Sequence, residues 1–521
     1  MAERVPVVVV GGGPVGLVAS LELARHGIRS LVLERHPGTT WHPKARNLNT
    51  RTMEIARHWG RAVHDELAAV DLPPEWKVQF VYTRTLAGQE LGRMRTAGFG
   101  GGGRDVSPEV PLLSSQDVFE PILRRGAEAT GLAELRFGHE VNRLEVGGAP
   151  GDDRAIVAVT ERATERTYRV EAEYVIAADG SESGIRTGLG IEMDGLKSLG
   201  HFVNVYFAAA LDPWVAHRPA VLFWVSSGDT RGVFQPLDAR GRWLCQIAYD
   251  GSAATFESYT AERCSEWIRT AVGDRRVEPE IRSIGSWTLN AAVARRLVSG
   301  RAILVGDAAH QLPPTGGFGV NTGIQGAHNA IWKLALVRAG LAGRELLETY
   351  EAERAAVAWT NATRSLENAR MVERINAAAR GEEASGLSAE EAVAASRRYG
   401  NFLGMELGFE YASPAVVADG SAPATVEDEV VDYVPNARPG SRAPHVWLER
   451  AGERCSTLDL FAPGFTLLGG RGRAWTAAAA GARERLRVPL RACAIGGEGD
   501  WQDPNRRFAE AYGIGEDGAV L

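Results

Sequence analysis

The residues best suited to chemistry in this chain are glycines whose spacing fits a bound dinucleotide. The first group reads Gly11-Gly12-Gly13-Pro14-Val15-Gly16. Gly11 allows a tight turn, Gly13 lets the backbone approach a pyrophosphate, and Gly16 lets a helix pack closely on a strand. Pro14 and Val15 begin that helix, whose N-terminus stabilises phosphate charge. The group therefore predicts a dinucleotide site.

An acidic side chain stands where such a site needs one. Glu34 follows Gly16 by 18 residues, at the position that accepts hydrogen bonds from ribose hydroxyls, and Arg35 comes next. A second match, from Gly98 to Gly103, follows Arg95-Thr96-Ala97, where the sequence pattern predicts no strand. We predict a loop there, with segment 97–107 gating substrate access, and not the second nucleotide site that a two-dinucleotide reductase would need.

A second glycine-rich group points to a flavin. The apolar run 302–305 ends at Gly306-Asp307, and Pro314, Gly317, Gly319, Val320 and Asn321 follow. A strand that passes through such a turn into a helix aims Asp307 at a polyol chain and the helix N-terminus at an electron-rich ring edge. A flavin has both features, whereas nicotinamide nucleotides lack the ribityl chain. FAD is the predicted cofactor.

Three further strings carry a family resemblance. They contain Arg46 (Pro43 to Glu54), Gln116 (Ser115 to Leu123) and the pair Asp179-Gly180 (Tyr174 to Arg186). Together with the glycine groups they resemble the class A, single-component FAD-dependent aromatic hydroxylases, in particular the phenol hydroxylase and aromatic-polyketide hydroxylase subgroup. The resemblance implies that Arg46 lies beside the flavin, Gln116 contacts its ribose or ribityl chain, and Asp179 and Gly180 support the pyrophosphate and NAD(P)H docking.

The same resemblance implies an oxygen-transfer reaction. NADPH or NADH would reduce FAD, O2 would add at flavin C4a, and the hydroperoxide would hydroxylate a phenolic or polycyclic, polyketide-like aromatic substrate, as in antibiotic biosynthesis. No catalytic residue is assigned. Two alternatives stay open, namely Baeyer-Villiger oxygen insertion on the same scaffold and a non-catalytic FAD-binding protein.

The elements that must position these residues predict an α/β protein of three parts. A Rossmann-like FAD-binding domain is expected from residues 1–195 and 285–400. Residues 196–284 should form an antiparallel substrate-binding sheet, because strand-like runs at 201–207, 221–225, 232–235, 243–249 and 281–289 are separated by turn residues. The period-two pattern does not say which face is inward. The candidates for substrate contact or aromatic packing are Tyr206, Trp224, Gln235, Tyr249 and Trp287.

The C-terminal third changes character twice. The run 324–394 is helical, and the proline-containing stretch 401–442 predicts a linker. Residues 443–521 resemble the thioredoxin-like domain of the same subgroup, but without a Cys-x-x-Cys pair they cannot form a working dithiol. Packing or a homodimer contact is the expected use. The family usually continues into one more strand beyond Leu521, so the resemblance implies a truncated C-terminus.

Composition excludes several classes of partner. Lys+Arg 58 against Asp+Glu 65 gives a net charge of -7, so no basic excess attracts nucleic acid or anionic lipid. The apolar stretch from Val5 to Leu21 stands where a signal peptide would, but three glycines and Pro14 interrupt it, which predicts part of the fold and not a targeting segment. Four separated cysteines predict no metal site and fit a reducing cytoplasm. The expected partner is a small aromatic molecule.

Overall fold

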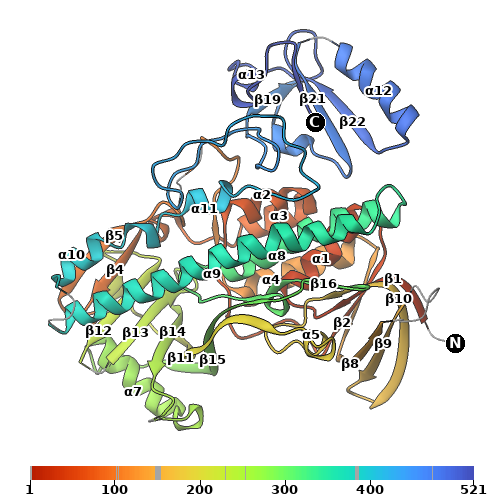
Figure 1. Ribbon diagram of the computed structural model, residues 1–521. Helices are drawn as coiled ribbons and strands as arrows, with labels where there is room; N and C mark the ends of the chain where they lie inside the picture. The colour runs from red at the N-terminus through yellow and green to blue at the C-terminus, as the bar shows by residue number, and fades with distance from the viewer. Residues whose placement is uncertain are drawn as a thin grey trace.

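The computed structural model describes residues 3–100, 103, 105–146, 154–228, 230–252, 254–381, 386–471 and 473–521 (Figure 1). Its first sheet is built on five parallel strands in the order β7-β2-β1-β10-β17. These strands are β1 (Glu3–Val10), β2 (Ser30–Glu34), β7 (Ala133–Phe137), β10 (Arg166–Ala177) and β17 (Ala302–Leu304). Antiparallel neighbours complete the sheet: β16 (Val298–Ser299) pairs with β17, and the hairpin of β8 (His139–Val146) and β9 (Ala155–Glu161) extends β10.

Helices cover this sheet, as its buried strands require. Val7, Val8 and Val9 have no exposed surface, because β1 is covered on both faces. The helix that follows β1, α1 (Pro14–Arg25), contacts α4 (Gln116–Ala129) and α8 (Phe318–Arg338), and α8 contacts the long helix α9 (Glu345–Ala379). In Figure 1, α9 runs across the whole width of the molecule.

The parallel register brings the chemistry-bearing turns together. Val10 pairs with Ala177, and Ala177 pairs with Leu304, so β1, β10 and β17 end at the same edge. The turns that follow them contain Gly11, Asp179 and Gly306. The carboxyl edge of a parallel sheet is where ligands bind in open α/β folds. The α/β and Rossmann-like predictions are thereby confirmed.

A second sheet of eight strands lies beside the first. Its order is β18-β15-β11-β14-β13-β12-β4-β5, and all neighbours are antiparallel except β12 and β4. The strands are β4 (Gln79–Thr83), β5 (Glu90–Arg95), β11 (Met193–Ala208), β12 (Leu222–Ser227), β13 (Thr230–Pro236), β14 (Arg242–Tyr249), β15 (Glu280–Ala294) and β18 (His310–Gln311). The five strands expected from the sequence are present as β11 to β15, and α7 (Ala261–Val272) packs on one face through Trp267 and Phe234.

The expected range 196–284 is too narrow for this sheet. β4 and β5 come from residues 79–95, which we predicted in the FAD-binding domain, and β11 and β15 both cross the predicted boundaries. Local alternation shows that a segment is a strand but not which distant strand it joins. The parallel pairing of β4 with β12 connects segments that are far apart in the chain, and therefore left no local signal.

A separate unit forms the C-terminal end, drawn in blue above α2 (Thr50–Ala56) and α3 (Arg61–Ala68) in Figure 1. It contains a hairpin, a three-stranded sheet and two helices, with a core around Val446, Leu448, Leu468 and Phe508. Its elements are β19 (Trp447–Arg450), β20 (Glu453–Ser456), β21 (Phe465–Gly469), α12 (Ala474–Leu486), β22 (Leu490–Ala494), α13 (Phe508–Ala511) and β23 (Ala519–Val520).

The remaining elements are short. They are β3 (Asn47–Leu48), β6 (Leu112–Leu113), α5 (Gly184–Gly188), α6 (Asp212–Val215), α10 (Ala389–Ala394) and α11 (Leu403–Leu407). The stretch 401–442, expected as a linker, contains α11, and after α11 no further helix or strand occurs before β19. This irregular stretch nevertheless contributes buried side chains, among them Val430, Arg442 and His445.

Candidate functional site

The first glycine turn combines tight packing with an open backbone. Gly11 has φ +102°, and a Cβ there would lie 2.3 Å from the carbonyl oxygen of Ala178. A Cβ on Gly16 would lie 2.0 Å from the carbonyl oxygen of Gly11. At Gly13, by contrast, a Cβ would meet no atom within 4 Å. The backbone at Gly13 is thus open to a ligand, while its two partners hold the turn against the sheet.

The helix that follows this turn has N–H groups available. α1 begins at Pro14, and no side chain caps it at Gly13. Since the first-turn N–H groups of a helix have no partner within the helix, an uncapped end favours an anion. Glu34 lies beside the turn, where it accepts hydrogen bonds from the N–H groups of Gly12 (2.7 Å) and His36 (2.8 Å). Arg35 is exposed.

The second glycine-rich group presents an unpartnered carboxylate. The Asp307 side chain is exposed and makes no hydrogen bond within the described part of the chain. Burial by the surrounding protein nevertheless raises the pKa of Asp307, an effect that the Lys44 charge opposes. A carboxylate that is open to solvent with protein around it is suited to bind hydroxyl groups of a ligand.

The helix beyond Asp307 is also uncapped. α8 starts after Gly317 (φ +70°) without a side-chain cap, and a Cβ on Gly319 would meet nothing within 4 Å. Pro314 is exposed and Val320 is half-buried. Asn321, however, is fully engaged: its Oδ1 accepts from the N–H of Asn49 (2.8 Å), and its Nδ2 donates to the carbonyls of Asn47 (2.9 Å) and Gly317 (2.7 Å). Its side chain therefore holds α8 in place.

Gln116 and Asp179 also have structural partners. The backbone N–H of Gln116 donates to the carbonyl of Ala45 (2.8 Å), and its Oε1 accepts from the N–H of Ala45 (3.2 Å). Its Nε2 donates to Glu120 (2.6 Å). It thereby fixes the segment that carries Arg46. Asp179 accepts from the hydroxyl of Ser183 (2.6 Å) and the N–H of Ile185 (3.1 Å), which shapes the turn at Gly180 (φ +85°).

Arg46 is a buried charge without a counter-ion among the described residues. It is 8% exposed, and it donates to the carbonyls of Pro236 (2.7 Å) and Val221 (2.8 Å) in the second sheet. Burial lowers the pKa of Arg46 to about 9, and Tyr399 opposes this shift. Arg46 therefore ties the first-domain segment to the second sheet and leaves a positive charge between them.

Strand pairing decides which face of the second sheet points toward Arg46. Trp224 pairs with Val233, Val233 with Gln246 and Gln246 with Asn204, so these side chains share a face. The same alternation places Gln235, Tyr206 and Trp287 on that face. His42 contacts the hydroxyl of Ser283 (2.7 Å), which pairs with Tyr206. This face is therefore turned toward residues 40–46.

Tyr249 does not belong with the other four substrate candidates. Tyr249 pairs with His201, whose side chain points to the opposite face of the sheet from those of Phe202 and Asn204. The Tyr249 ring lies 5.3 Å from that of Tyr259, on the α7 side. We exclude it from the candidate site. Two of the remaining four are partly committed to the protein, since the Tyr206 hydroxyl accepts from Arg242 (2.9 Å) and Trp287 donates to Asn204 (2.8 Å).

Tyr399 is a site residue that sequence reasoning missed. It is 3% exposed, and its ring lies 4.9 Å from Phe80 and 6.4 Å from Trp224, measured between centroids. Trp224 Nε1 is buried and has no hydrogen-bond partner. Tyr399 follows the predicted helical region, in a segment without periodicity. Only its ring contacts with Phe80 and Trp224 of the second sheet mark it as part of the site.

The site is closed on one side by aromatic side chains. Phe318, the first residue of α8, lies 5.1 Å from Phe402, which lies 5.2 Å from Phe99. Phe99 thus packs the first part of the glycine-rich segment 97–107 against Phe402. The N–H of Gly98 donates to the carbonyl of Gly400 (2.9 Å). Residues 101, 102 and 104, on which the predicted gate also rests, lie outside the described residues.

Other binding chemistries find little support in the described ranges. They contain no group of three or more His, Cys, Asp or Glu side chains that could hold a metal ion. Within the same ranges, no helix is both long and apolar enough to cross a membrane. Cys245, Cys264, Cys455 and Cys493 are all free.

A parallel sheet with a glycine turn at its carboxyl edge, a second uncapped helix and an unpartnered aspartate together define an FAD-binding α/β protein. Comparison with known proteins makes the assignment specific. Residues 4–365 match the FAD binding domain family, so the chain belongs to that family.

The relatives are flavoprotein monooxygenases. Aklavinone 12-hydroxylase RdmE of Streptomyces purpurascens is 36% identical over 528 residues, covering 100% of this chain and 94% of the relative. The 2,4-dichlorophenol 6-monooxygenase of Delftia acidovorans is 34% identical over 551 residues, covering 99% and 92%. The crystal structure of the flavin-dependent monooxygenase PieE with FAD and substrate superimposes with a TM-score of 0.92, at 35% identity, over 99% of this chain and 94% of that one. The predicted class of FAD-dependent aromatic hydroxylase is confirmed, and the chain is a flavoprotein monooxygenase.

Proposed function

We propose that this enzyme uses NADPH or NADH and O2 to hydroxylate a phenolic or polycyclic, polyketide-like aromatic compound. The observation that carries the proposal is the open Asp307 carboxylate between two uncapped helices, opposite a sheet face with unsatisfied donors. Relatives that act on a dichlorophenol and on aklavinone support both substrate sizes.

The residues fit FAD as a cofactor. Gly13 and the start of α1 at Pro14 and Val15 would bind the pyrophosphate, and Glu34, next to Arg35, the adenosine ribose. Asp307 would bind the ribityl hydroxyls, while the N-terminus of α8 would face the ring edge. Two further sets of residues belong to the proposed site. Those that shape it are Gly11, Gly16, Gln116, Asp179, Gly180 and Asn321, and those that border it are Pro314, Gly317, Gly319 and Val320. When bound, FAD supplies the electron transfer and oxygen activation.

The protein's own contribution is orientation and charge. We propose that the substrate lies on the sheet face of Trp224 and Gln235, with an oxygen substituent near Trp224 Nε1 and the Tyr399 hydroxyl. Both groups can donate a hydrogen bond, and the buried Arg46 charge favours the ionised form of a substrate hydroxyl. An ionised phenol is more electron-rich, and therefore more easily hydroxylated.

The test begins with the purified protein and its visible spectrum. NADPH and NADH oxidation is then followed under air with phenol, 2,4-dichlorophenol and aklavinone. A rate that rises with one compound, and a product heavier by one oxygen with a new ring hydroxyl by NMR, supports the proposal. An oxygen inserted beside a ketone would instead identify a Baeyer-Villiger enzyme. FAD-loaded protein that is silent with every compound would favour a non-catalytic FAD-binding protein.

A further inference from the structure

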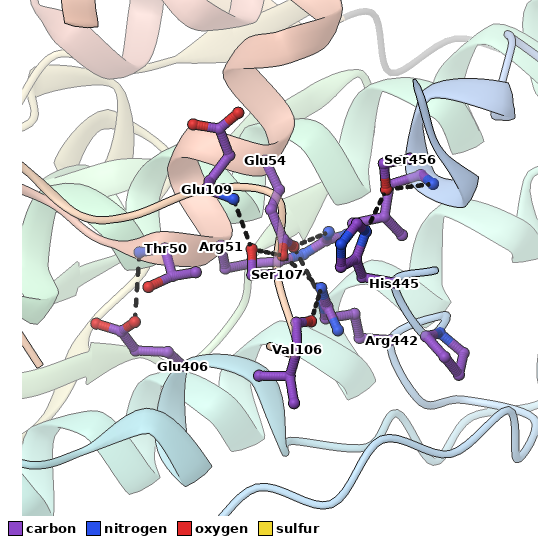
Figure 2. A network of polar contacts seen from close by, with 12 residues as sticks. Thr50, Arg51, Glu54, Val106, Ser107, Glu109, Glu406, Arg442, His445 and Ser456 are labelled. Carbon is purple, nitrogen blue, oxygen red and sulfur yellow. Dashed lines mark hydrogen bonds and ion pairs between the residues drawn. The ribbon is translucent and has the colours of Figure 1, made fainter. Parts of the chain in front are cut away.

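We propose that the C-terminal unit and the irregular stretch that leads into it position the FAD site through two ion pairs, Arg442–Glu54 and Arg57–Asp459, which we call the clamp. The clamp holds helix α2, and with it the segment Arg46–Asn49 that borders the site. This inference rests on the proposed function only for its catalytic readout, because FAD binding can be measured by itself. The network around Glu54 is shown in Figure 2.

The first pair is almost completely removed from solvent. The side chains of Arg442 and Glu54 are 2% and 1% exposed. Arg442 donates through Nε (2.9 Å) and Nη2 to the two carboxylate oxygens of Glu54, through Nη1 to the Tyr433 hydroxyl (2.8 Å), and through Nη2 to the carbonyl of Val106 (3.0 Å). This bidentate geometry is the most specific that a guanidinium offers.

Glu54 gathers further partners from the first domain. Arg51 donates to it from the same helix (2.9 Å), and the Ser107 hydroxyl donates from a neighbouring segment (2.6 Å), as Figure 2 shows. Burial by itself would raise the pKa of Glu54, but Arg442, Arg51 and Ser107 outweigh it and lower the pKa to about 2. Glu54 is therefore ionised at physiological pH, and the pair is a true ion pair.

The second pair joins the same helix region to the C-terminal core. Arg57, directly after α2, donates to both oxygens of Asp459 (2.7 and 2.8 Å). Asp459 in turn accepts from the N–H of Ser456 (2.8 Å), whose hydroxyl contacts His445 (2.7 Å). The position of α2 is thus fixed by two separate contacts with residues from 442 onward.

The other end of α2 reaches the FAD site. Asn49 caps the helix by accepting from the N–H of Thr52 (3.0 Å), and its own N–H donates to Asn321 at the start of α8. Arg46 lies three residues before Asn49 in the same segment. A displacement of α2 would therefore be passed directly to the charge at Arg46 and to the uncapped end of α8.

A buried ion pair is weak evidence for a purely stabilising role. Replacing such a pair with apolar residues of similar size is often neutral or stabilising, because the desolvation of two charges offsets their attraction. What an apolar pair lacks is direction, since it does not fix the relative orientation of two elements. The clamp joins residues 388 positions apart, and it meets the site through one short helix. Orientation of α2 is the role that fits these facts.

The experiment replaces both members of the buried pair at once, and the charge that remains, Arg51, is partly exposed (23%). The double variant Glu54→Leu/Arg442→Met is compared with wild type for secondary structure, FAD dissociation constant and peroxide released per NADPH oxidised. The clamp predicts a folded protein whose FAD dissociation constant rises at least tenfold and whose peroxide fraction at least doubles. A dissociation constant within twofold of wild type would overturn the proposal.

A matched control and a second variant keep the test decisive. Glu90→Gln removes the ion-pair partner of Arg218, in a partly buried pair (27% and 5% exposed) between β5 and the segment before β12, and should leave FAD affinity unchanged. If the double variant does not fold, Arg57→Gln is measured by the same criteria, since Arg57 is 22% exposed; this variant also removes the ion pair between Arg57 and Glu109. If wild type oxidises no substrate, the proposed function fails, and FAD affinity still decides the clamp.

Discussion

Two glycines of the same turn have opposite surroundings. A Cβ on Gly16 would collide with the carbonyl oxygen of Gly11 at 2.0 Å, whereas a Cβ on Gly13 would meet nothing within 4 Å. The first glycine therefore serves the packing of α1 on β1, and the second serves the approach of a ligand. At the scale of single residues, a shared motif thus divides into a folding role and a binding role.

This division predicts different outcomes for two alanine variants. Gly13→Ala should leave the unfolding midpoint of the apoprotein close to wild type and raise the FAD dissociation constant at least tenfold, because its methyl group occupies the ligand's space. Gly16→Ala should lower the unfolding midpoint of the apoprotein itself. Thermal unfolding and flavin fluorescence titration measure both quantities. Equal loss of stability in the two variants would contradict the assignment.

Glu406 is a buried carboxyl group that favours the neutral form. One oxygen accepts from the N–H of Thr50 at 3.3 Å, and the other has no partner. Burial raises the pKa of Glu406 to about 8, a rise that Thr50 opposes and the nearby Glu54 supports. The folded protein therefore keeps a proton on Glu406 that the unfolded chain loses above its ordinary pKa of 4.5.

The consequence is a stability that falls as pH rises. Between about pH 4.5 and about pH 8, the free energy of unfolding of the wild type falls relative to that of Glu406→Gln. The slope is up to about 1.4 kcal/mol per pH unit, because Glu406 loses its proton on unfolding. Denaturant unfolding of Glu406→Gln and wild type at several pH values measures this difference. The exposed Glu427→Gln serves as control, and parallel curves for Glu406→Gln and wild type would show that Glu406 does not titrate as proposed.

At the scale of elements, α8 makes one close contact that requires a glycine. A Cβ on Gly323 would lie 2.7 Å from a side-chain methyl group of Val15 in α1 and 2.9 Å from the Cα of Gly306, so α8 has no room for a side chain of its own at this contact. Three residues further along, a Cβ on Gly326 would meet only the Tyr350 hydroxyl, at 3.5 Å. The helix that carries the uncapped end is thus aligned by the close approach at Gly323 as well as by the Asn321 side chain.

The two glycines of α8 provide a matched pair of variants. Gly326→Ala should raise stability by up to about 1 kcal/mol, since alanine favours the helix and the site has room. Gly323→Ala should lower stability despite the same propensity gain and weaken FAD binding, because α8 must move away from Asp307. Unfolding and FAD titration check both, and similar values for the two variants would refute the close-contact argument.

At the scale of the whole molecule, the cofactor site is shared between parts. Arg46 joins the first domain to the second sheet, and Asn321 joins α8 to the segment before α2. The clamp joins the α2 region to the irregular stretch after α11 and to the C-terminal unit. Whatever binds at the carboxyl edge of the parallel sheet is therefore coupled to the folding of the protein as a whole.

Cofactor binding should accordingly stabilise the entire chain. FAD at about 100 times its dissociation constant should raise the free energy of unfolding by about 2.7 kcal/mol, through binding to the folded state alone. Riboflavin, which lacks the pyrophosphate and adenosine, should produce a much smaller shift at the same concentration. Thermal unfolding with each compound makes the comparison. Equal shifts would mean that the turn at Gly13 takes no part in binding.

The sequence by itself determined the class of cofactor and the fold that binds it. The turns at Gly11 to Gly16 and at Gly306-Asp307 are contiguous, and their glycines and carboxylate report local backbone geometry that few other residues permit. The five strands of β11 to β15 were predictable for the same reason, because alternation is a property of neighbouring residues.

Only the tertiary structure decided which residues meet. Strand register placed Trp224 toward Arg46 and Tyr249 away from it, and it added β4 and β5 to the second sheet. Tyr399 and Arg442 come from segments without periodicity, and their partners lie far away in the chain. Such contacts depend on the packing of whole elements, whose pairing no local pattern encodes, and so the chemistry was visible in the sequence while the composition of the site was not.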